Sequence, residues 1–247
     1  MRDDTYLTLT DVQNCPLYGY CTDMGKEEIC THTCTRGDNM NFFLASSNLP
    51  KPYWNLDKLD FNELQTDEIA RYMKYMFVNI DHFVHRGFNA YFYGWSNTGK
   101  TTWATGLLVR YLQFVSSYGT HRVPAVYVNV PELLGDLKYF SGRVNPWLDE
   151  LMQDIKHCAL VVWDDLLLTE LTPFEFQTLY RLINGRLAEN LSNIFVNDDS
   201  PEDLMITNRK LYSKVCNHSS CIEFTQDVTG KVLKFENLIG TTEEDNS

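Results

Sequence analysis

The chain has 247 residues, of which 44% are hydrophobic, and a formal net charge of −12. This length and composition can bury a substantial core, as one large domain or as one domain with a small appendage. The acidic balance argues against broad, charge-driven binding of nucleic acid, because that affinity comes from Lys and Arg that displace counterions, and it favours a protein partner.

No run of residues approaches the roughly 18 apolar residues that a membrane span needs. The start of the chain, residues 1–6, also lacks the basic and apolar regions of a signal peptide. We therefore expect a cytoplasmic protein without a membrane partner.

Four cysteines gather in residues 1–47, a segment with little apolar periodicity that cannot build a core of its own. Cys15, Cys21, Cys30 and Cys34 follow the spacing C-x5-C-x8-C-x3-C, which offers four thiolates to one tetrahedral Zn²⁺. His32 could replace Cys30 or Cys34. Free buried cysteines or an oxidised pair are the alternatives, although thiols stay reduced in the cytosol. The sequence thus predicts a small Cys-rich zinc-binding module.

Residues 48–61 read as a linker, because Pro50 and Pro52 restrict the residues before them to extended conformations. A single large domain is expected over residues 62–236, followed by an acidic tail over residues 237–247. Apolar residues recur every three or four positions over residues 62–86, which predicts an amphipathic helix closed by Gly87.

The middle of the chain alternates apolar runs with helical patterns. Strands are predicted at residues 89–93, 124–130, 159–163 and 193–196, and helices at 102–118, from 131 onward and at 173–189. Continuous apolar runs are typical of strands buried on both faces of a parallel sheet. The predicted fold is α/β, a parallel sheet flanked by helices on both faces.

Residues 94–101 fit the pattern G-x-x-x-x-G-K-[ST] between a strand and a helix, which indicates a phosphate-binding P-loop. Gly94 and Gly99 permit the turns, and inward N–H groups with the helix N-terminus attract the anion. Lys100 would reach the β- and γ-phosphates of ATP or ADP, and Thr101 would coordinate Mg²⁺. The predicted nucleotide-binding residues are Gly94, Trp95, Ser96, Asn97, Thr98, Gly99, Lys100, Thr101 and Thr102.

Two acidic residues, Asp164 and Asp165, end the apolar run 159–163 and would stand beside the phosphates at the carboxyl end of a strand. We expect Asp164 to hold Mg²⁺ through its water shell and Asp165 to orient the attacking water. The alternative is a pair of solvated turn residues after a core strand.

Together these segments resemble the helicase loaders of the DnaC/DnaI type, which are AAA+ ATPases. The resemblance covers roughly residues 45–225 and is carried by residues 45–54, the P-loop and residues 160–166, 180–186 and 200–204. It implies a hydrolase for ATP that binds a hexameric replicative helicase, contacts single-stranded DNA weakly, and self-associates in that complex. The Cys-rich segment resembles the zinc-containing, helicase-contacting domain of DnaI, and its short form resembles a bacteriophage or mobile-element loader.

The same resemblance places two further catalytic groups. The sensor position falls on Asp198, which would repel a γ-phosphate, with Asn197 one residue earlier as the alternative. The arginine-finger position holds Lys214, with Arg209 nearby, and Lys cannot grip phosphate oxygens in two places as Arg does. Hydrolysis would then be slow. A solvated helix face is the other interpretation of these cations.

Residues 138–143 combine Lys138 and Arg143 with two aromatic residues, which suits single-stranded DNA but equally suits a helix end packed into the core. Two other functions remain open beside the loader. One is a nearly silent adaptor that binds the helicase and uses ATP to stabilise its fold. The other is a transposition helper of the IstB type, which would form filaments on duplex DNA.

Overall fold

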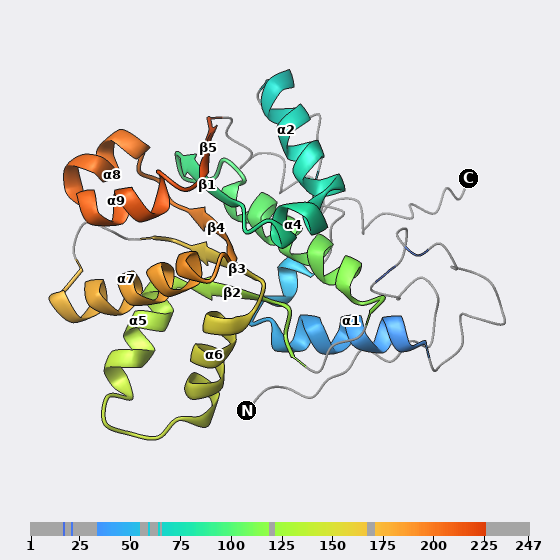
Figure 1. Ribbon diagram of the computed structural model, residues 1–247, viewed down its shortest axis with the longest axis horizontal. Coiled ribbons are helices and arrows are strands. Elements are labelled where there is room, and N and C mark those ends of the chain that lie inside the picture. Colours follow the sequence, from blue (N-terminus) through green and yellow to red (C-terminus); the bar gives the residue numbers. More distant parts are fainter. Residues whose placement is uncertain are drawn as a thin grey trace, which may run out of the picture.

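The structure is a computed structural model, and it describes Leu17, Cys21, Leu59, Leu64 and residues 34–54, 66–118, 122–166 and 171–225. Its strands are β1 (Asn89–Gly94), β2 (Ala125–Asn129), β3 (Leu160–Asp164), β4 (Ser192–Val196) and β5 (Ser220–Phe224). Within the described residues they form one parallel sheet in the order β2-β3-β4-β1-β5. Helices cover both faces of this sheet (Figure 1), which confirms the predicted α/β fold.

One face of the sheet is covered by the helices that come first in the chain. These are α1 (Thr35–Ser46), the short 3₁₀ helix η2 (Lys51–Tyr53), α2 (Asp67–Val78), α3 (Ile80–His85) and α4 (Lys100–Val115). Their apolar side chains meet alternate residues of the strands, such as Phe92 and Val162, in one buried core cluster. The central element of this layer is α4, which packs against β1, β2, β3 and β4.

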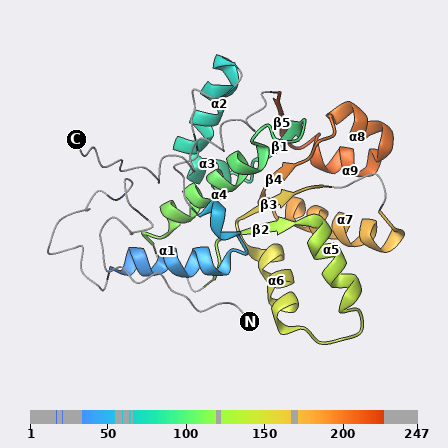
Figure 2. The same ribbon diagram turned by 180° about the vertical axis from the view of Figure 1, so that it is seen from behind.

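The opposite face is covered by the helices of the second half of the chain. These are α5 (Val130–Tyr139), α6 (Pro146–His157), α7 (Pro173–Ala188), α8 (Pro201–Thr207) and α9 (Arg209–Val215). They bury the other set of strand residues, including Tyr91 and Trp163, in a second core cluster. The view from behind in Figure 2 shows the sheet between the two layers.

The helix α1 was not foreseen in the sequence, and it belongs to the core of this fold. Met40, Phe43 and Leu44 are spaced by three and one residues, are fully buried, and lie in the same core cluster as α4. The side chain of Asn39 also donates a hydrogen bond to the Ser116 carbonyl just after α4, at 2.9 Å. The expected boundary between a module of residues 1–47 and a linker stays a prediction, but the last residues of that module pack into the first core cluster.

The segment after α1 is attached to strand β2. The backbone N–H of Tyr127 donates to the Ser47 carbonyl at 2.8 Å, and the side chain of Asn48 donates to the Tyr127 carbonyl at 3.1 Å. Further along, the Trp54 indole N–H donates to the Leu49 carbonyl at 2.8 Å. The start of this stretch is therefore held against the sheet by hydrogen bonds, and the Trp54 bond to Leu49 folds the first part of the predicted linker, residues 49–54, back on itself.

The single helix predicted over residues 62–86 is wrong in one respect, because the helical stretch is interrupted at Asn79. This residue has φ −110° and ψ 36°, outside the helical region, and separates α2 from α3. Its side-chain amide donates to the Tyr75 carbonyl at 2.9 Å, a local bond that competes with helix geometry. Gly87, at φ 66°, ends α3 as expected.

Prolines and capping residues fix the positions at which several helices begin. Pro131, Pro146, Pro173 and Pro201 occupy first-turn positions, where their missing N–H has no partner to lose. Two of these helices also carry capping boxes, formed by Thr172 with Glu175 and by Ser200 with Asp203. Three of these helices, α5, α7 and α8, thus begin at set positions beyond the carboxyl ends of β2, β3 and β4, whereas α6 follows α5.

The amino ends of β3 and β4 are tied together by the buried guanidinium of Arg186 in α7. It donates to the carbonyls of Ile155, Cys158 and Ser192 and to the side chain of Asn193, at distances between 2.6 and 2.9 Å. Since every one of these acceptors lies at or before the start of a strand, this cluster stabilises the sheet at the edge opposite to the strand carboxyl ends.

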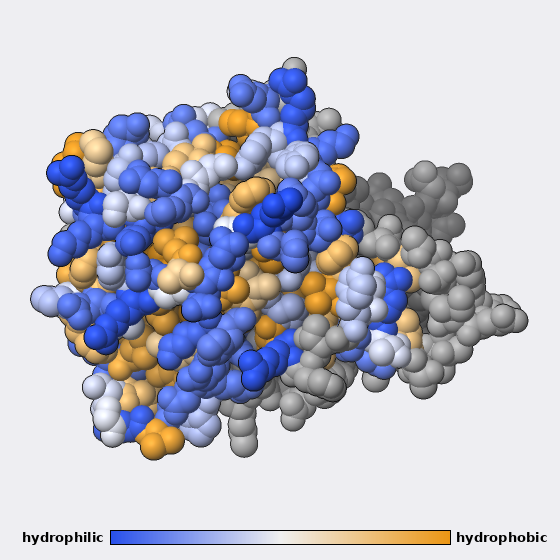
Figure 3. Space-filling model, viewed as in Figure 1, coloured by the Kyte–Doolittle hydropathy of each residue, from blue (hydrophilic) through white to orange (hydrophobic). Residues whose placement is uncertain are grey.

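The surface is mixed in character. On the face shown in Figure 3, small groups of apolar residues alternate with polar side chains over the helices of the second half of the chain. Exposed apolar side chains include Phe174, Ile206 and Val144. Among the described residues, no helix combines the length and apolarity that crossing a membrane requires.

Candidate nucleotide-binding site

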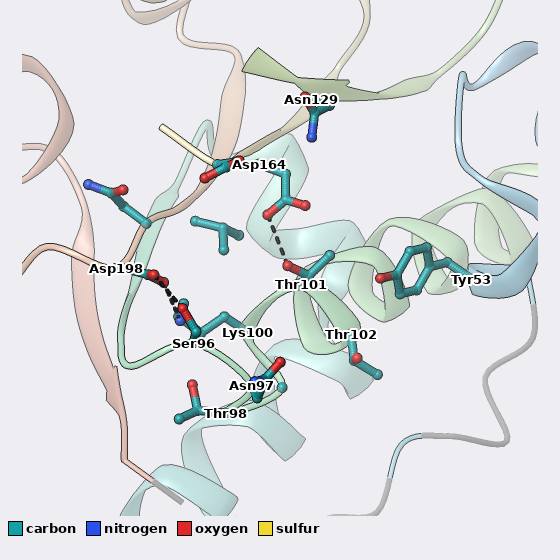
Figure 4. A pocket seen from close by; sticks show the side chains of 14 residues that line it. Tyr53, Ser96, Asn97, Thr98, Lys100, Thr101, Thr102, Asn129, Asp164 and Asp198 are labelled. Atoms are coloured by element: carbon teal, nitrogen blue, oxygen red, sulfur yellow. Dashed lines mark hydrogen bonds and ion pairs between the residues drawn. The ribbon is translucent and has the colours of Figure 1, made fainter. Parts of the chain in front are cut away.

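A pocket of about 600 Å³ opens at the carboxyl ends of β1, β3 and β4, where the strands of a parallel sheet bring their following loops together (Figure 4). Most of the residues that line it come from the P-loop and from the ends of β3 and β4. The lining residues are Tyr53, Ser96, Asn97, Thr98, Gly99, Lys100, Thr101, Thr102, Asn129, Asp164, Asp165, Val196, Asn197 and Asp198.

The P-loop has the backbone that its glycines predict. Gly94 lies at φ 128°, and a Cβ at this position would come within 2.0 Å of the Phe224 carbonyl oxygen in β5. Gly99 precedes α4 in the left-handed region at φ 86°, and Asn97 is left-handed at φ 63°. Alternating turns of this kind make a concave nest of backbone N–H groups that suits a phosphate. The side chain of Thr98 donates to the Trp95 carbonyl at 2.8 Å and closes the loop.

The Lys100 ammonium lies inside the loop and is 6% exposed. It donates to the carbonyls of Gly94 and Trp95, both at 2.7 Å, and forms an ion pair with Asp198 Oδ1 at 2.9 Å. The charge is thus held at the mouth of the nest, where phosphates of a nucleotide would lie.

Asp164 is held by two hydroxyl groups. Thr101 Oγ1 donates to its Oδ1 at 3.0 Å, and Tyr127 Oη donates to its Oδ2 at 2.7 Å. The carboxylate ends β3 and is only 7% exposed. A threonine hydroxyl beside a carboxylate offers the hard oxygen ligands that Mg²⁺ takes together with phosphate oxygens and water, so these residues fit that ion. Tyr53 also lines the pocket, and the pKa of its hydroxyl is raised, first by burial and then by the negative charge of Asp164.

Asp165 lies next to this pair in a strained backbone conformation, at φ 59°. Its pKa is raised, first by burial and then by the negative charges of Asp164 and Asp198. A carboxylate with a raised pKa, close to a phosphate site, is a suitable group to accept a proton or orient a water.

The two candidates for the sensor position differ in their contacts. Asn197 lines the pocket, and its amide donates to Tyr91 Oη at 3.3 Å and to Asp199 Oδ2 at 3.4 Å. Asp198 instead meets the P-loop, because Ser96 Oγ donates to its Oδ2 at 2.7 Å and Lys100 pairs with its Oδ1. Partial burial would raise the pKa of Asp198, but the hydrogen bonds from Lys100 and Ser96 outweigh it and lower the pKa overall.

Several predicted site residues lie away from the pocket lining. Gly94 and Trp95 contribute carbonyls to Lys100, while the Trp95 side chain is 79% exposed. Arg209 and Lys214 lie in α9 and do not line the pocket.

The stretch after α5 divides between surface and core. Tyr139 is 69% exposed and the guanidinium of Arg143 lies 5.9 Å from the centre of its ring, whereas Phe140 packs against the second core cluster. Core packing therefore holds for Phe140 and not for Tyr139, and contact with single-stranded DNA stays a prediction.

The proposed zinc ligands fall mostly outside the described residues. Cys15, Cys30 and His32 are not among them, while Cys21 and Cys34 are and carry free thiols. Arg36 Nη1 donates to Cys21 Sγ at 3.9 Å. Within the part of the chain that the structure describes, no group of three or more His, Cys, Asp or Glu residues could hold a metal ion.

Sequence reasoning missed Tyr127, Tyr53 and Asn129 as site residues. Tyr127 and Asn129 lie in β2, and their place depends on β2 being the neighbour of β3, with Asn129 opposite Asp164 in the parallel register. The one available signal was polarity, since Tyr127 and Asn129 interrupt an otherwise apolar run.

No protein-family model matches this sequence, and no curated protein matches it either. Solved structures do share the fold. A crystal structure of the DnaC helicase loader has a TM-score of 0.57 at 17% identity, covering 71% of this chain and 99% of that chain. DnaI has a TM-score of 0.52 at 21% identity, covering 72% of this chain and 92% of that chain.

The replication initiator DnaA bound to AMPPCP and single-stranded DNA has a TM-score of 0.56 at 14% identity. That comparison covers 80% of this chain and 58% of the DnaA chain, so this chain spans little more than half of that relative. This chain therefore shares with these proteins the fold of a parallel sheet flanked by helices on both faces.

Proposed function

We propose that this chain is an ATP-dependent helicase loader, an AAA+ ATPase that binds the hexameric replicative DNA helicase and helps place it on single-stranded DNA at the start of replication. The supporting observation is that Lys100, Thr101 and Asp164 meet in one pocket, within a fold that aligns over 99% of the chain of the DnaC helicase loader.

In this proposal the nest of residues 95–99 and Lys100 bind the phosphates of ATP or ADP. Thr101 and Asp164 hold Mg²⁺, which when bound neutralises charge on the phosphates. Asp165 orients the attacking water, and Asn197 stands across the pocket as the polar contact to that water or to the terminal phosphate. Each of these roles needs the residue type that the chain provides at that position.

A neighbouring subunit would complete the site. Lys214 or Arg209 of α9 acts on the nucleotide of the next copy in the helicase complex, and the choice between them decides the rate. Because a Lys ammonium contacts phosphate as a point charge, a finger at Lys214 gives slower hydrolysis than an Arg would.

The helicase contact is assigned to the Cys-rich segment, with Zn²⁺ held by Cys15, Cys21, Cys30 and Cys34, or by His32 in place of Cys30 or Cys34. Metal analysis of the purified chain tests this part separately. About one zinc per chain, lost in Cys21→Ser, is the expected result; a chain that is free of zinc and still binds the helicase contradicts it.

Single-stranded DNA is assigned to the exposed Tyr139 and Arg143, since an aromatic ring can stack on a base while a guanidinium meets its phosphate. The expected binding is weak and falls with added salt, because the net charge of the chain is −12.

Native mass spectrometry with the replicative helicase of the same host, with and without ATP, tests the loader directly. A complex that forms with the full chain and is lost when residues 1–33 are removed supports the proposal. This truncation leaves the buried helix α1 in place but removes Leu17, which is 1% exposed and belongs to the first core cluster. Binding of ADP by the truncated chain is therefore measured as the check that its core is intact. No complex under any nucleotide condition rejects it.

A catalytically weak adaptor is the second candidate, and the ion pair between Lys100 and Asp198 favours it, because a carboxylate here opposes triphosphate binding. Turnover measured with helicase and single-stranded DNA present separates the two. Sustained hydrolysis that disappears in Lys100→Ala rejects the adaptor, and ATP binding without turnover rejects the loader mechanism.

A further inference from the structure

The P-loop lysine already has a full set of partners from its own chain. An ammonium has three N–H donors, and Lys100 contacts three acceptors, the Gly94 and Trp95 carbonyls and the Asp198 carboxylate. A phosphate can reach this ammonium only by replacing one of them. The carbonyls belong to the loop itself, so Asp198 is the partner that can leave.

Asp198 accepts hydrogen bonds from the P-loop groups that would otherwise bind a phosphate. Its two oxygens accept from the Lys100 ammonium and from the Ser96 hydroxyl, so one carboxylate bridges the P-loop and the end of β4, as Figure 4 shows. These are a cation and a hydroxyl donor, the groups that would otherwise meet an anionic oxygen of the nucleotide. The carboxylate therefore occupies a phosphate position with a matching charge.

The position corresponds to the terminal phosphate of a triphosphate. The nest of a P-loop surrounds the α- and β-phosphates, while its lysine reaches outward to β and γ. Asp198 approaches from β4, on the side of the pocket that also holds Asp164 and Asp165. A γ-phosphate placed there would meet the carboxylates of Asp164, Asp165 and Asp198. Mg²⁺ would compensate the negative charge of Asp164, its proposed ligand. A diphosphate ends before this region and avoids the repulsion.

We propose that Asp198 acts as an internal stand-in for the γ-phosphate and makes the site favour nucleoside diphosphate over triphosphate. This inference rests on the proposed nucleotide site. With ADP bound, Asp198 keeps its contacts with Ser96 and Lys100; with ATP bound, it must turn away. Its side chain is 62% exposed, so it has room to do so.

The test compares the Kd values of ADP and of AMPPCP, a triphosphate analogue that is not hydrolysed, by isothermal titration calorimetry with Mg²⁺. For the unaltered chain we expect ADP to bind roughly three- to tenfold more tightly than AMPPCP, the range expected for an exposed ion pair plus a like charge. In Asp198→Asn the ratio should approach one, because the amide keeps a contact with Ser96 but neither pairs with Lys100 nor repels phosphate.

Glu202→Gln is the matched control, since it removes one negative charge four residues further on, from an exposed position outside the pocket lining. It should keep the preference for ADP. Two results overturn the inference while leaving the nucleotide site intact. One is a ratio of the two Kd values that is the same in Asp198→Asn as in the unaltered chain, and the other is a ratio close to one in the unaltered chain itself. Failure of both ligands to bind the unaltered chain overturns the proposed function as well.

Discussion

Asp164 and Asp198 are two carboxylates at the same edge of the sheet, and each accepts two hydrogen bonds from residues of the site. Asp164 ends a central strand, is 7% exposed, and is held by two hydroxyls. Asp198 follows β4, has a side chain that is 62% exposed, and is held by a cation and a hydroxyl. The difference teaches that burial, more than the number of hydrogen bonds, separates a fixed carboxylate, the proposed Mg²⁺ ligand Asp164, from a replaceable partner.

The largest expected effect comes from replacing Lys100, the ion-pair partner of the exposed Asp198 carboxylate. Lys100→Ala removes the ammonium that would meet the phosphates, and we expect nucleotide affinity to fall by about 100-fold and hydrolysis to disappear. Calorimetry with ADP and a phosphate-release assay measure this. Lys156→Ala, an exposed lysine of α6, is the control; an equal loss in that variant would show that the effect is not specific to the site.

Changing the buried carboxylate should affect the metal rather than the nucleotide. Asp164→Asn keeps the acceptor for Thr101 but lowers the negative charge that attracts Mg²⁺, so hydrolysis should fall by roughly 100-fold. Binding of ADP in the presence of EDTA should persist. Asp149→Asn, at an exposed position of α6, should leave both properties unchanged. Loss of ADP binding without Mg²⁺ would instead assign Asp164 a structural role.

A smaller effect is expected from the hydroxyl that holds Asp164. Tyr127→Phe removes a hydrogen bond to a buried carboxylate, and the Mg²⁺ concentration for half-maximal hydrolysis should rise by about tenfold, with little change in the affinity for ADP in EDTA. Tyr111→Phe, in α4 and outside the pocket lining, is the control. An unchanged Mg²⁺ dependence would mean that Thr101 alone fixes the carboxylate.

The smallest effect is a shift in pH dependence. Burial and the charges of Asp164 and Asp198 raise the pKa of Asp165. If its ionised form orients water, hydrolysis is lost as pH falls through that raised pKa. Asp198→Asn removes one of the charges, so the acidic limb of the rate at saturating nucleotide should move to lower pH by a fraction of a unit, while Glu202→Gln leaves it in place. A move to higher pH would contradict this role for Asp165.

Most of the sheet could be predicted because each strand from β1 to β4 is a continuous apolar run next to a helical pattern. The strand β5 was not foreseen, since only Ile222 and Phe224 are buried in it and it lies at the edge. The break at Asn79 and the packing of α1 were missed for other reasons. The break rests on a local side-chain bond from Asn79 to the Tyr75 carbonyl, which the apolar pattern does not contain. The packing of α1 depends on tertiary contacts, and its apolar positions are too few for a clear helical period.

The site could be predicted where function requires a fixed spacing and not where it depends on neighbours in space. The P-loop and the acidic pair after β3 have such a spacing, and the structure brings Lys100, Thr101 and Asp164 together. The contact of Asp198 with Lys100 joins residues 98 positions apart and requires β4 to lie beside β1. No local pattern contains that information.

Tyr127 connects two parts of the molecule that are far apart in the chain. Its backbone is bonded to Ser47 and Asn48, and its hydroxyl is bonded to Asp164. A force that pulls the segment after α1 away from the sheet would therefore tilt the tyrosine that holds Asp164, the proposed ligand of Mg²⁺. Thermodynamic linkage makes this coupling reciprocal. If Mg²⁺ binding stabilises the docked position of the segment, a partner that binds the docked segment strengthens Mg²⁺ binding by the same free energy.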